Sequence, residues 1–367
     1  MIFHEIDIRR ILATNLLGIE SKSHKRDWDF YSEQYVTAFF TLLDTGREER
    51  KCSNTSILNV KFMAFLFLMR HSLELLMKKQ IVQNGCEMLK GHNLKNLATV
   101  LGVNVQDFLS DFAQLLPESE GDCFRYTTDN NGVRFFSVLN GISYFETCNH
   151  FISYYNQLKN KNVDYLPDDR LHRGYFTFYP REVIYNGVVA SHYDEAIYDL
   201  LMAIENKQIA AQQIYLPLLF LIRHSLELKL KQAVEPIGDA VDANDKDKIW
   251  KEHSVSKIFK MLNKYINKAI DLIPANDGLL QESLLYKKKA HDFQQQINKL
   301  DSNSYILRFP VDRKGGLSNY MPSKSDLSDA LRLYVEADTF LVFAVEVLAK
   351  NGYLKLGDDI MHELMGC

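Results

Sequence analysis

Apolar residues recur at helical spacing over most of the chain, and long segments lack the glycine and proline that interrupt helices. This pattern predicts four helices in each half of the chain. They cover residues 31–43, 60–80, 93–101 and 138–158, and then 193–206, 209–234, 254–266 and 324–350. Pro217 lies within the sixth, so that helix is kinked there or begins there. The pattern as a whole predicts an all-α fold.

A hexapeptide, Arg-His-Ser-Leu-Glu-Leu, occurs twice, at residues 70–75 and 223–228, each time directly after an apolar run. Other landmarks flank both copies in the same order. They are Tyr31 and Tyr193 at the start of an apolar helix, His92 and His253 before a further helix, and Arg125 and Arg308, each followed by an aromatic residue. Such ordered similarity indicates an internal duplication.

The duplication predicts two tandem four-helix bundles. Residues 1–160 form the N-terminal half, 161–184 the connection and 185–367 the C-terminal half. Turn-forming residues follow both Arg125 and Arg308, including Gly315 and Gly316 in the second half. We therefore predict a short β-hairpin before the last helix of each half.

Composition narrows the class of protein. With 43 basic and 47 acidic residues the formal charge is −4, which argues against a strongly basic protein that coats nucleic acid but allows a local basic cleft. Five cysteines without a C-x-x-C pair favour a reducing compartment and no structural zinc, and no motif calls for a cofactor. The apolar runs are shorter than the roughly 20 residues that span a bilayer. We expect a cytoplasmic protein without membrane contact, and the sequence leaves its oligomeric state open.

The repeated motif places the same polar side chains on one helix face in both halves. They are Arg70, His71, Glu74 and Lys78, and then Arg223, His224, Glu227 and Lys231. His92 and His253 each precede a residue that favours the helix N-cap, so both are predicted to lie at helix entrances.

Three interpretations of these faces remain open at this point. The faces are solvated stripes stabilised by ion pairs, or they line a groove that binds phosphate or an acidic partner. In the third, they are internal, with Arg125 paired to Glu74 and Arg308 paired to Glu227 as links between hairpin and bundle.

The order of an apolar helix, Arg-His-x-x-Glu-Leu-x-x-Lys, a histidine at a helix entrance, an Arg-Tyr or Arg-Phe element and a long closing helix resembles the HEPN superfamily. This resemblance implies small four-helix bundles, found in prokaryotic antiviral defence, toxin-antitoxin and RNA-processing proteins. Many members are metal-independent ribonucleases in which paired bundles form a composite site from arginine and histidine. Their signature is an arginine, four to six intervening residues and then a histidine, but the histidine positions here hold Leu75, Leu76 and Met77, and Leu228, Lys229 and Leu230.

The main hypothesis is a tandem HEPN-like protein that binds RNA or nucleotide phosphate and acts as a metal-independent endoribonuclease. The alternative is a non-catalytic module that docks a protein partner or a phosphorylated small ligand. The candidate catalytic residues are Arg70, His71, Arg223 and His224, and the candidate binding residues are Glu74, Lys78, His92, Arg125, Glu227, Lys231, His253 and Arg308.

Overall fold

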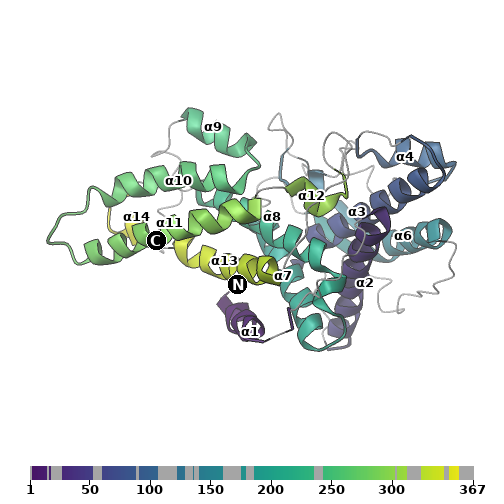
Figure 1. Cartoon of the computed structure of the whole chain (residues 1–367), viewed down its shortest axis with the longest axis horizontal. Coiled ribbons are helices and arrows are strands. Elements are labelled where there is room, and N and C mark those ends of the chain that lie inside the picture. The colour runs from purple at the N-terminus through teal and green to yellow at the C-terminus, as the bar shows by residue number, and fades with distance from the viewer. Residues whose placement is uncertain are drawn as a thin grey trace.

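The computed structural model describes residues 2–14, 16–17, 27–52, 60–87, 91–105, 122–128, 135, 140–159, 175–178, 186–234, 243–301, 304–311, 324–342 and 347–354. Within these residues the protein is mostly helical (Figure 1). Its helices are α1 (Ile2–Leu12), α2 (Trp28–Cys52), α3 (Phe62–Gln83), α4 (Leu94–Leu101), α6 (Tyr144–Lys159), α7 (Asn186–Glu205), α8 (Tyr215–Val234), α9 (Ala243–Lys251), α10 (Val255–Ile270), α11 (Leu279–Asp301), α12 (Ser304–Arg308), α13 (Lys324–Val342) and α14 (Leu348–Lys350), with the 3-10 turns η2 (Asp122–Phe124) and η4 (Ala211–Gln213). The predicted all-α class is confirmed.

The two helices that carry the repeated motif, α3 and α8, lie at the centre of the molecule. Almost every residue of both helices is buried, on the polar face as well as on the apolar face. The helix α2 packs against α3, α7 packs against α8, and α2 and α7 each contact both central helices. Pro217 lies in the first turn of α8, where its missing N–H leaves no helical hydrogen bond unmade.

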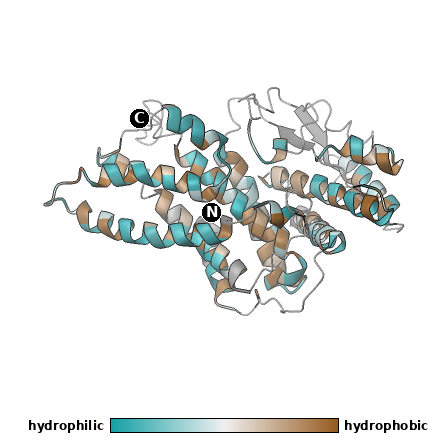
Figure 2. Ribbon diagram, turned by 45° about the horizontal axis from the view of Figure 1, so that its top comes forward, coloured by the Kyte–Doolittle hydropathy of each residue, from teal (hydrophilic) through white to brown (hydrophobic). Residues whose placement is uncertain are grey.

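More of the remaining helices pack on α8 than on α3. The helix α6 packs on α3, whereas α10, α12 and α13 pack on α8, and α11 lies on α10 and α13. Figure 2 shows hydrophobic residues concentrated where helices face one another, with hydrophilic residues on the outer sides. In α10, for example, buried Val255, Ile258, Phe259 and Leu262 recur at the three- and four-residue spacing of one helix face.

Several contacts cross the predicted boundary between the halves, among them two that involve α7. The N-terminal helix α1 packs on α7 and α13, and Arg10 donates two hydrogen bonds to the carboxylate of Glu205, at 2.7 and 2.8 Å. A buried ion pair joins Lys61, just before α3, to Asp199 of α7. The two halves are therefore packed as one body in these regions.

The predicted hairpins are not confirmed. Arg125 directly follows the 3-10 turn η2, and Arg308 is the last residue of the short helix α12. The two strands, β1 (Asn140–Ser143) and β2 (Tyr175–Phe178), pair antiparallel with each other across α6. Residues 129–134 and 312–323, which the hairpins would include, lie outside the described residues.

Candidate functional site

The polar residues of the first half surround a buried carboxylate on α3. Glu74 accepts hydrogen bonds from Arg70 at 3.2 Å and from Lys78 at 2.8 Å. The Nδ1 atom of His92 lies 2.6 Å from the same carboxylate, and Arg70 also donates to the main-chain oxygen of His92 at 2.6 Å. The arginine therefore fixes the backbone at the entrance of α4, where Asn93 caps the helix as predicted.

The same cluster recurs on α8. Glu227 accepts from Arg223 at 3.1 Å and from Lys231 at 3.0 Å. It also lies 3.0 Å from Nδ1 of His253, whose main-chain oxygen accepts from Arg223 at 2.5 Å. Ser254 caps α10 as predicted. The motif thus repeats in its contacts as well as in its sequence.

The two arginine segments cross over between the halves. Nε2 of His71, on α3, lies 3.2 Å from the carbonyl oxygen of Arg308, which belongs to the second half. Nε2 of His224, on α8, lies 2.8 Å from the carbonyl oxygen of Arg125, which belongs to the first half. Because a carbonyl oxygen only accepts, Nε2 carries the proton in both histidines.

The aromatic residue after each arginine covers the cluster of the opposite half. Phe309 packs on His92, and Tyr126 packs on His253, with ring centroids 5.0 and 4.9 Å apart. Each ring also lies under the lysine ammonium of the cluster that it covers, at 4.6 and 5.1 Å. Each half therefore closes the polar cluster of the other.

A row of four stacked rings joins the two clusters. Phe67 of α3 stacks on Phe220 of α8, with centroids 4.8 Å apart and ring planes 21° apart. His71 stacks on Phe67 at 5.4 Å, and His224 stacks on Phe220 at 5.7 Å. The phenylalanine precedes its histidine by one helical turn in both halves, which is why the rings align.

A tyrosine on the neighbouring helix holds each arginine segment. The hydroxyl of Tyr35 donates to the oxygen of Leu307 at 3.0 Å, and that of Tyr193 donates to the oxygen of Phe124 at 2.9 Å. Both acceptors directly precede an arginine. The structural counterpart of Tyr193 is therefore Tyr35, so the sequence alignment of Tyr193 with Tyr31 was wrong by one helical turn.

The histidines on the central helices are held neutral. Burial lowers the pKa of His71 to about 4 and that of His224 to about 3, against the opposing effect of the neighbouring carboxylates. The pKa of Glu74 and that of Glu227 both lie well below the usual value. Burial would raise them, but the surrounding imidazole and cationic groups outweigh it.

The two crossing arginines differ in their partners. The Arg125 guanidinium pairs with Asp122, and its pKa is raised because Tyr126 and this carboxylate outweigh the effect of burial. Arg308 lies over aromatic rings, among them Phe220 at 5.7 Å, and within the described residues no carboxylate pairs with it. Its Nε is buried without a hydrogen-bond partner.

The positive charge of Arg125 also influences the pKa of Arg308. Burial first, and then the positive charge of Arg125, lower the pKa of Arg308 to about 10. A buried cation without an anionic partner is destabilised, and a bound anion would offset this cost. The pair Arg125 and Arg308, beside the row of stacked rings, is therefore the candidate functional site.

The polar faces are internal, as one of the three interpretations had them. The eight residues of the repeated motif are buried, at 0 to 8% exposure, so they are not solvated stripes. The predicted pairing of Arg125 with Glu74 and of Arg308 with Glu227 is wrong. Each arginine segment instead contacts the opposite half, through its carbonyl oxygen. The catalytic role of Arg70, His71, Arg223 and His224 stays a prediction, and their burial favours a structural role.

His92 and His253 lie at helix entrances as predicted, and they differ in exposure. The side chain of His92 is 22% exposed and that of His253 is 50% exposed. In both, a carboxylate faces Nδ1 and fixes the orientation of the ring. The imidazole of His253 is thus oriented and open to solvent.

Sequence reasoning missed Phe67, Phe220, Tyr35 and Asp122. The two phenylalanines stood at matching positions of the apolar runs before each motif, and that match was the available signal. Nothing local distinguished Tyr35 from Tyr31, since both lie on the same buried face of α2.

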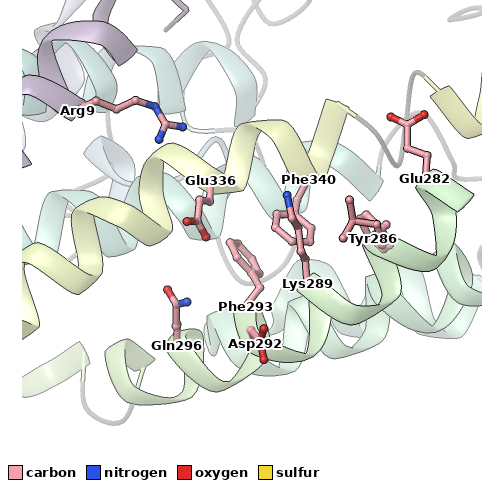
Figure 3. Close-up of a pocket in the computed structure, with 10 residues that line it drawn as sticks. Arg9, Glu282, Tyr286, Lys289, Asp292, Phe293, Gln296, Glu336 and Phe340 are labelled. Carbon is pink, nitrogen blue, oxygen red and sulfur yellow. The ribbon is translucent and has the colours of Figure 1, made fainter.

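A separate hollow of about 540 Å³ lies between α1, α11 and α13 (Figure 3). Phe293, Phe340 and Tyr286 line it, and charged side chains of both signs, including Lys289 and Glu336, surround it. Mixed exposed charges do not select an anion, so the arginine pair remains the stronger candidate.

Comparisons with protein-family models, with curated proteins and with solved structures found no match. No helix in the described part of the chain is both long and apolar enough to cross a membrane. Over the same residues, no group of three or more His, Cys, Asp or Glu side chains could hold a metal ion. Geometry alone must therefore indicate the function.

Proposed function

We propose that the protein is a tandem pair of HEPN-like bundles that binds RNA, with a phosphate group held between Arg125 and Arg308. The observation that carries this proposal is the guanidinium of Arg308, which pairs with no carboxylate among the described residues and is repelled by the charge of Arg125. Guanidinium groups bind phosphate through directed, charge-assisted hydrogen bonds. A phosphate between the two arginines would relieve their repulsion.

Aromatic groups next to the arginines favour a nucleic acid over inorganic phosphate. Tyr126 and His253 stack at the edge of the site, and half of the His253 side chain is open to solvent. Unpaired RNA bases stack on such rings. A role in a prokaryotic defence or toxin-antitoxin system is part of the same proposal.

The test of binding compares single-stranded RNA with free nucleotides by fluorescence anisotropy. Arg308→Gln should weaken RNA binding at least tenfold, because it removes the unpaired guanidinium and leaves the main-chain contact with His71 intact. The matched control is Arg332→Gln, which removes the same charge from an exposed position on α13. Equal affinity of Arg308→Gln and the control for RNA would refute the proposal, and tight binding of mononucleotides alone would reassign the ligand.

Cleavage of the bound RNA is a further part of the proposal, and it assigns proton transfer to His253. Glu227 orients this ring through Nδ1, and half of the side chain is open to solvent, as access for a general base requires. Incubation of RNA with the protein in EDTA, with wild type and His253→Ala side by side, tests it. Intact RNA with the wild type, or equal cleavage by both proteins, would leave RNA binding without catalysis.

Docking of a protein partner is the second candidate function, and one surface favours it. Leu272 lies just after α10, and Leu284 and Leu285 lie in the second turn of α11, with exposures of 70, 47 and 51%. Exposed apolar side chains that form a patch are typical of protein interfaces. Docking would be supported by a partner that is captured after ribonuclease treatment by the wild type and by Arg308→Gln, but not by the double variant Leu272→Ser/Leu285→Ser. Recovery of the same proteins with both variants would exclude docking at these leucines.

A further inference from the structure

We propose that single-stranded RNA leaves the arginine pair on one side only, over His253 and into a lysine-lined groove between α9 and α10. This inference rests on the proposed RNA binding and adds the course of the strand. The groove encloses about 430 Å³ and is lined by Asp247, Lys248, Lys251, Glu252, Lys257, Lys260 and Met261.

The groove is a local basic surface on an acidic chain. Seven lysines but only three acidic residues lie between positions 243 and 270, whereas the whole chain has a formal charge of −4. The four lysines that line the groove are all exposed. A row of ammonium groups at helical spacing can follow a phosphate backbone without reading its sequence.

The lysines of the groove are available to phosphate. Lys251 pairs with Asp247 at 2.9 Å and Lys257 pairs with Glu252 at 3.1 Å, both at the surface. Exposed ion pairs of this kind contribute about 0–1 kcal/mol each, so a phosphate can displace them at little cost. Lys260 makes no ion pair with the described residues.

A chain of contacts links the arginine pair to the groove. Tyr126, which follows Arg125, packs on the ring of His253. The backbone N–H of His253 donates to Glu252 at 3.0 Å, and Glu252 lines the groove together with Lys257.

Among the described residues, the matching region of the other half carries fewer lysines. The counterpart of α10 is α4, which has eight residues and a single lysine, Lys95. Its entrance histidine, His92, is also less exposed than His253. A strand that passes between the arginines therefore meets more of the described cations on the α10 side than on the α4 side, which favours one direction of exit.

The test measures RNA affinity as a function of salt concentration with the full chain. In the groove variant, Lys251, Lys257 and Lys260 are each changed to Gln. The control variant changes Lys287, Lys288 and Lys289 of α11 to Gln and so removes the same charge. Each lost phosphate contact lowers the slope of log affinity against log salt by about 0.7 for single strands, so the groove variant should lose about 2 and the control close to none.

A second arm separates this inference from the proposed function. If the two lysine variants show equal slopes while Arg308→Gln still abolishes binding, the groove inference is overturned and the arginine site stands. If the wild type binds no RNA, both are overturned. A reduced slope in the groove variant alone, with a short oligonucleotide losing less than a long one, supports the path over α10.

Discussion

Replacement of Arg308 by Gln is expected to stabilise the fold. At pH 7 the guanidinium is charged in both the folded and the unfolded chain, but in the folded chain burial and Arg125 lower its pKa from 12.5 to about 10. A lowered pKa of a cationic group means that its charge destabilises the fold. The penalty is present at every pH below about 10 and disappears as the pH approaches 12.5.

The size of the effect follows from the shift. One pKa unit corresponds to about 1.4 kcal/mol, so the shift sets an upper limit of roughly 3 kcal/mol. Arg308 is partly exposed, and water screens part of this repulsion. Its contacts with the rings of Phe220, Tyr305 and Phe309 are also lost, at about 0.5–1 kcal/mol for an exposed contact. We expect a net gain of about 1 kcal/mol in the free energy of unfolding.

Denaturant unfolding at pH 7 in chloride buffer measures this gain, and Arg125→Gln is the matched comparison. Arg125 pairs with Asp122, so its loss leaves a partly buried carboxylate alone and should lower stability. Arg308→Gln is thus expected to raise the free energy of unfolding, and Arg125→Gln is expected to lower it. Added RNA should raise the stability of the wild type but not that of Arg308→Gln. If both substitutions lower stability equally, Arg308 is a structural cation and the site has been misassigned.

Three further predictions concern the buried clusters. Glu227→Gln leaves three basic groups around a neutral amide and should lower stability by about 3–5 kcal/mol in denaturant unfolding; a loss below 1 kcal/mol would contradict the buried cluster. The pKa values of about 4 for His71 and about 3 for His224 lie below the unfolded value of 6.5. The free energy of unfolding should therefore be at its full value above pH 6.5 and fall as the pH drops toward these pKa values. A free energy of unfolding that does not change over this acid range would exclude the burial of the two histidines. Tyr35→Phe and Tyr193→Phe should each cost about 1 kcal/mol by thermal unfolding, and unchanged transitions would mean that these hydroxyls do not hold the arginine segments.

The helices that carry the repeat could be predicted because their order and periodicity are local. α3, α8 and the capped entrances of α4 and α10 lie where the pattern places them. Helix α11 was missed, although its buried residues recur every three or four positions, because Ser283 and Ala290 are among them and supply little apolar signal.

The contact partners could not be predicted. A duplicated sequence shows which residues are equivalent, but it gives the same pattern whether a segment packs on its own half or on the other. The internal interpretation paired Arg125 and Arg308 within their own halves, whereas in the structure both segments contact the opposite half. The two hairpins stay predictions, because most of the residues that would form them lie outside the described part of the chain.

Fusion of the two halves in one chain permits an asymmetry that a pair of identical subunits could not have. The residue three positions before each arginine is Asp122 in one half and Tyr305 in the other. Two identical subunits would carry either two paired arginines, with no charge left to attract phosphate, or two unpaired ones, with a larger burial penalty. The duplicated chain keeps one paired and one unpaired guanidinium. It thereby confines the destabilising charge to Arg308 and, under the proposed function, still provides two donors for one phosphate.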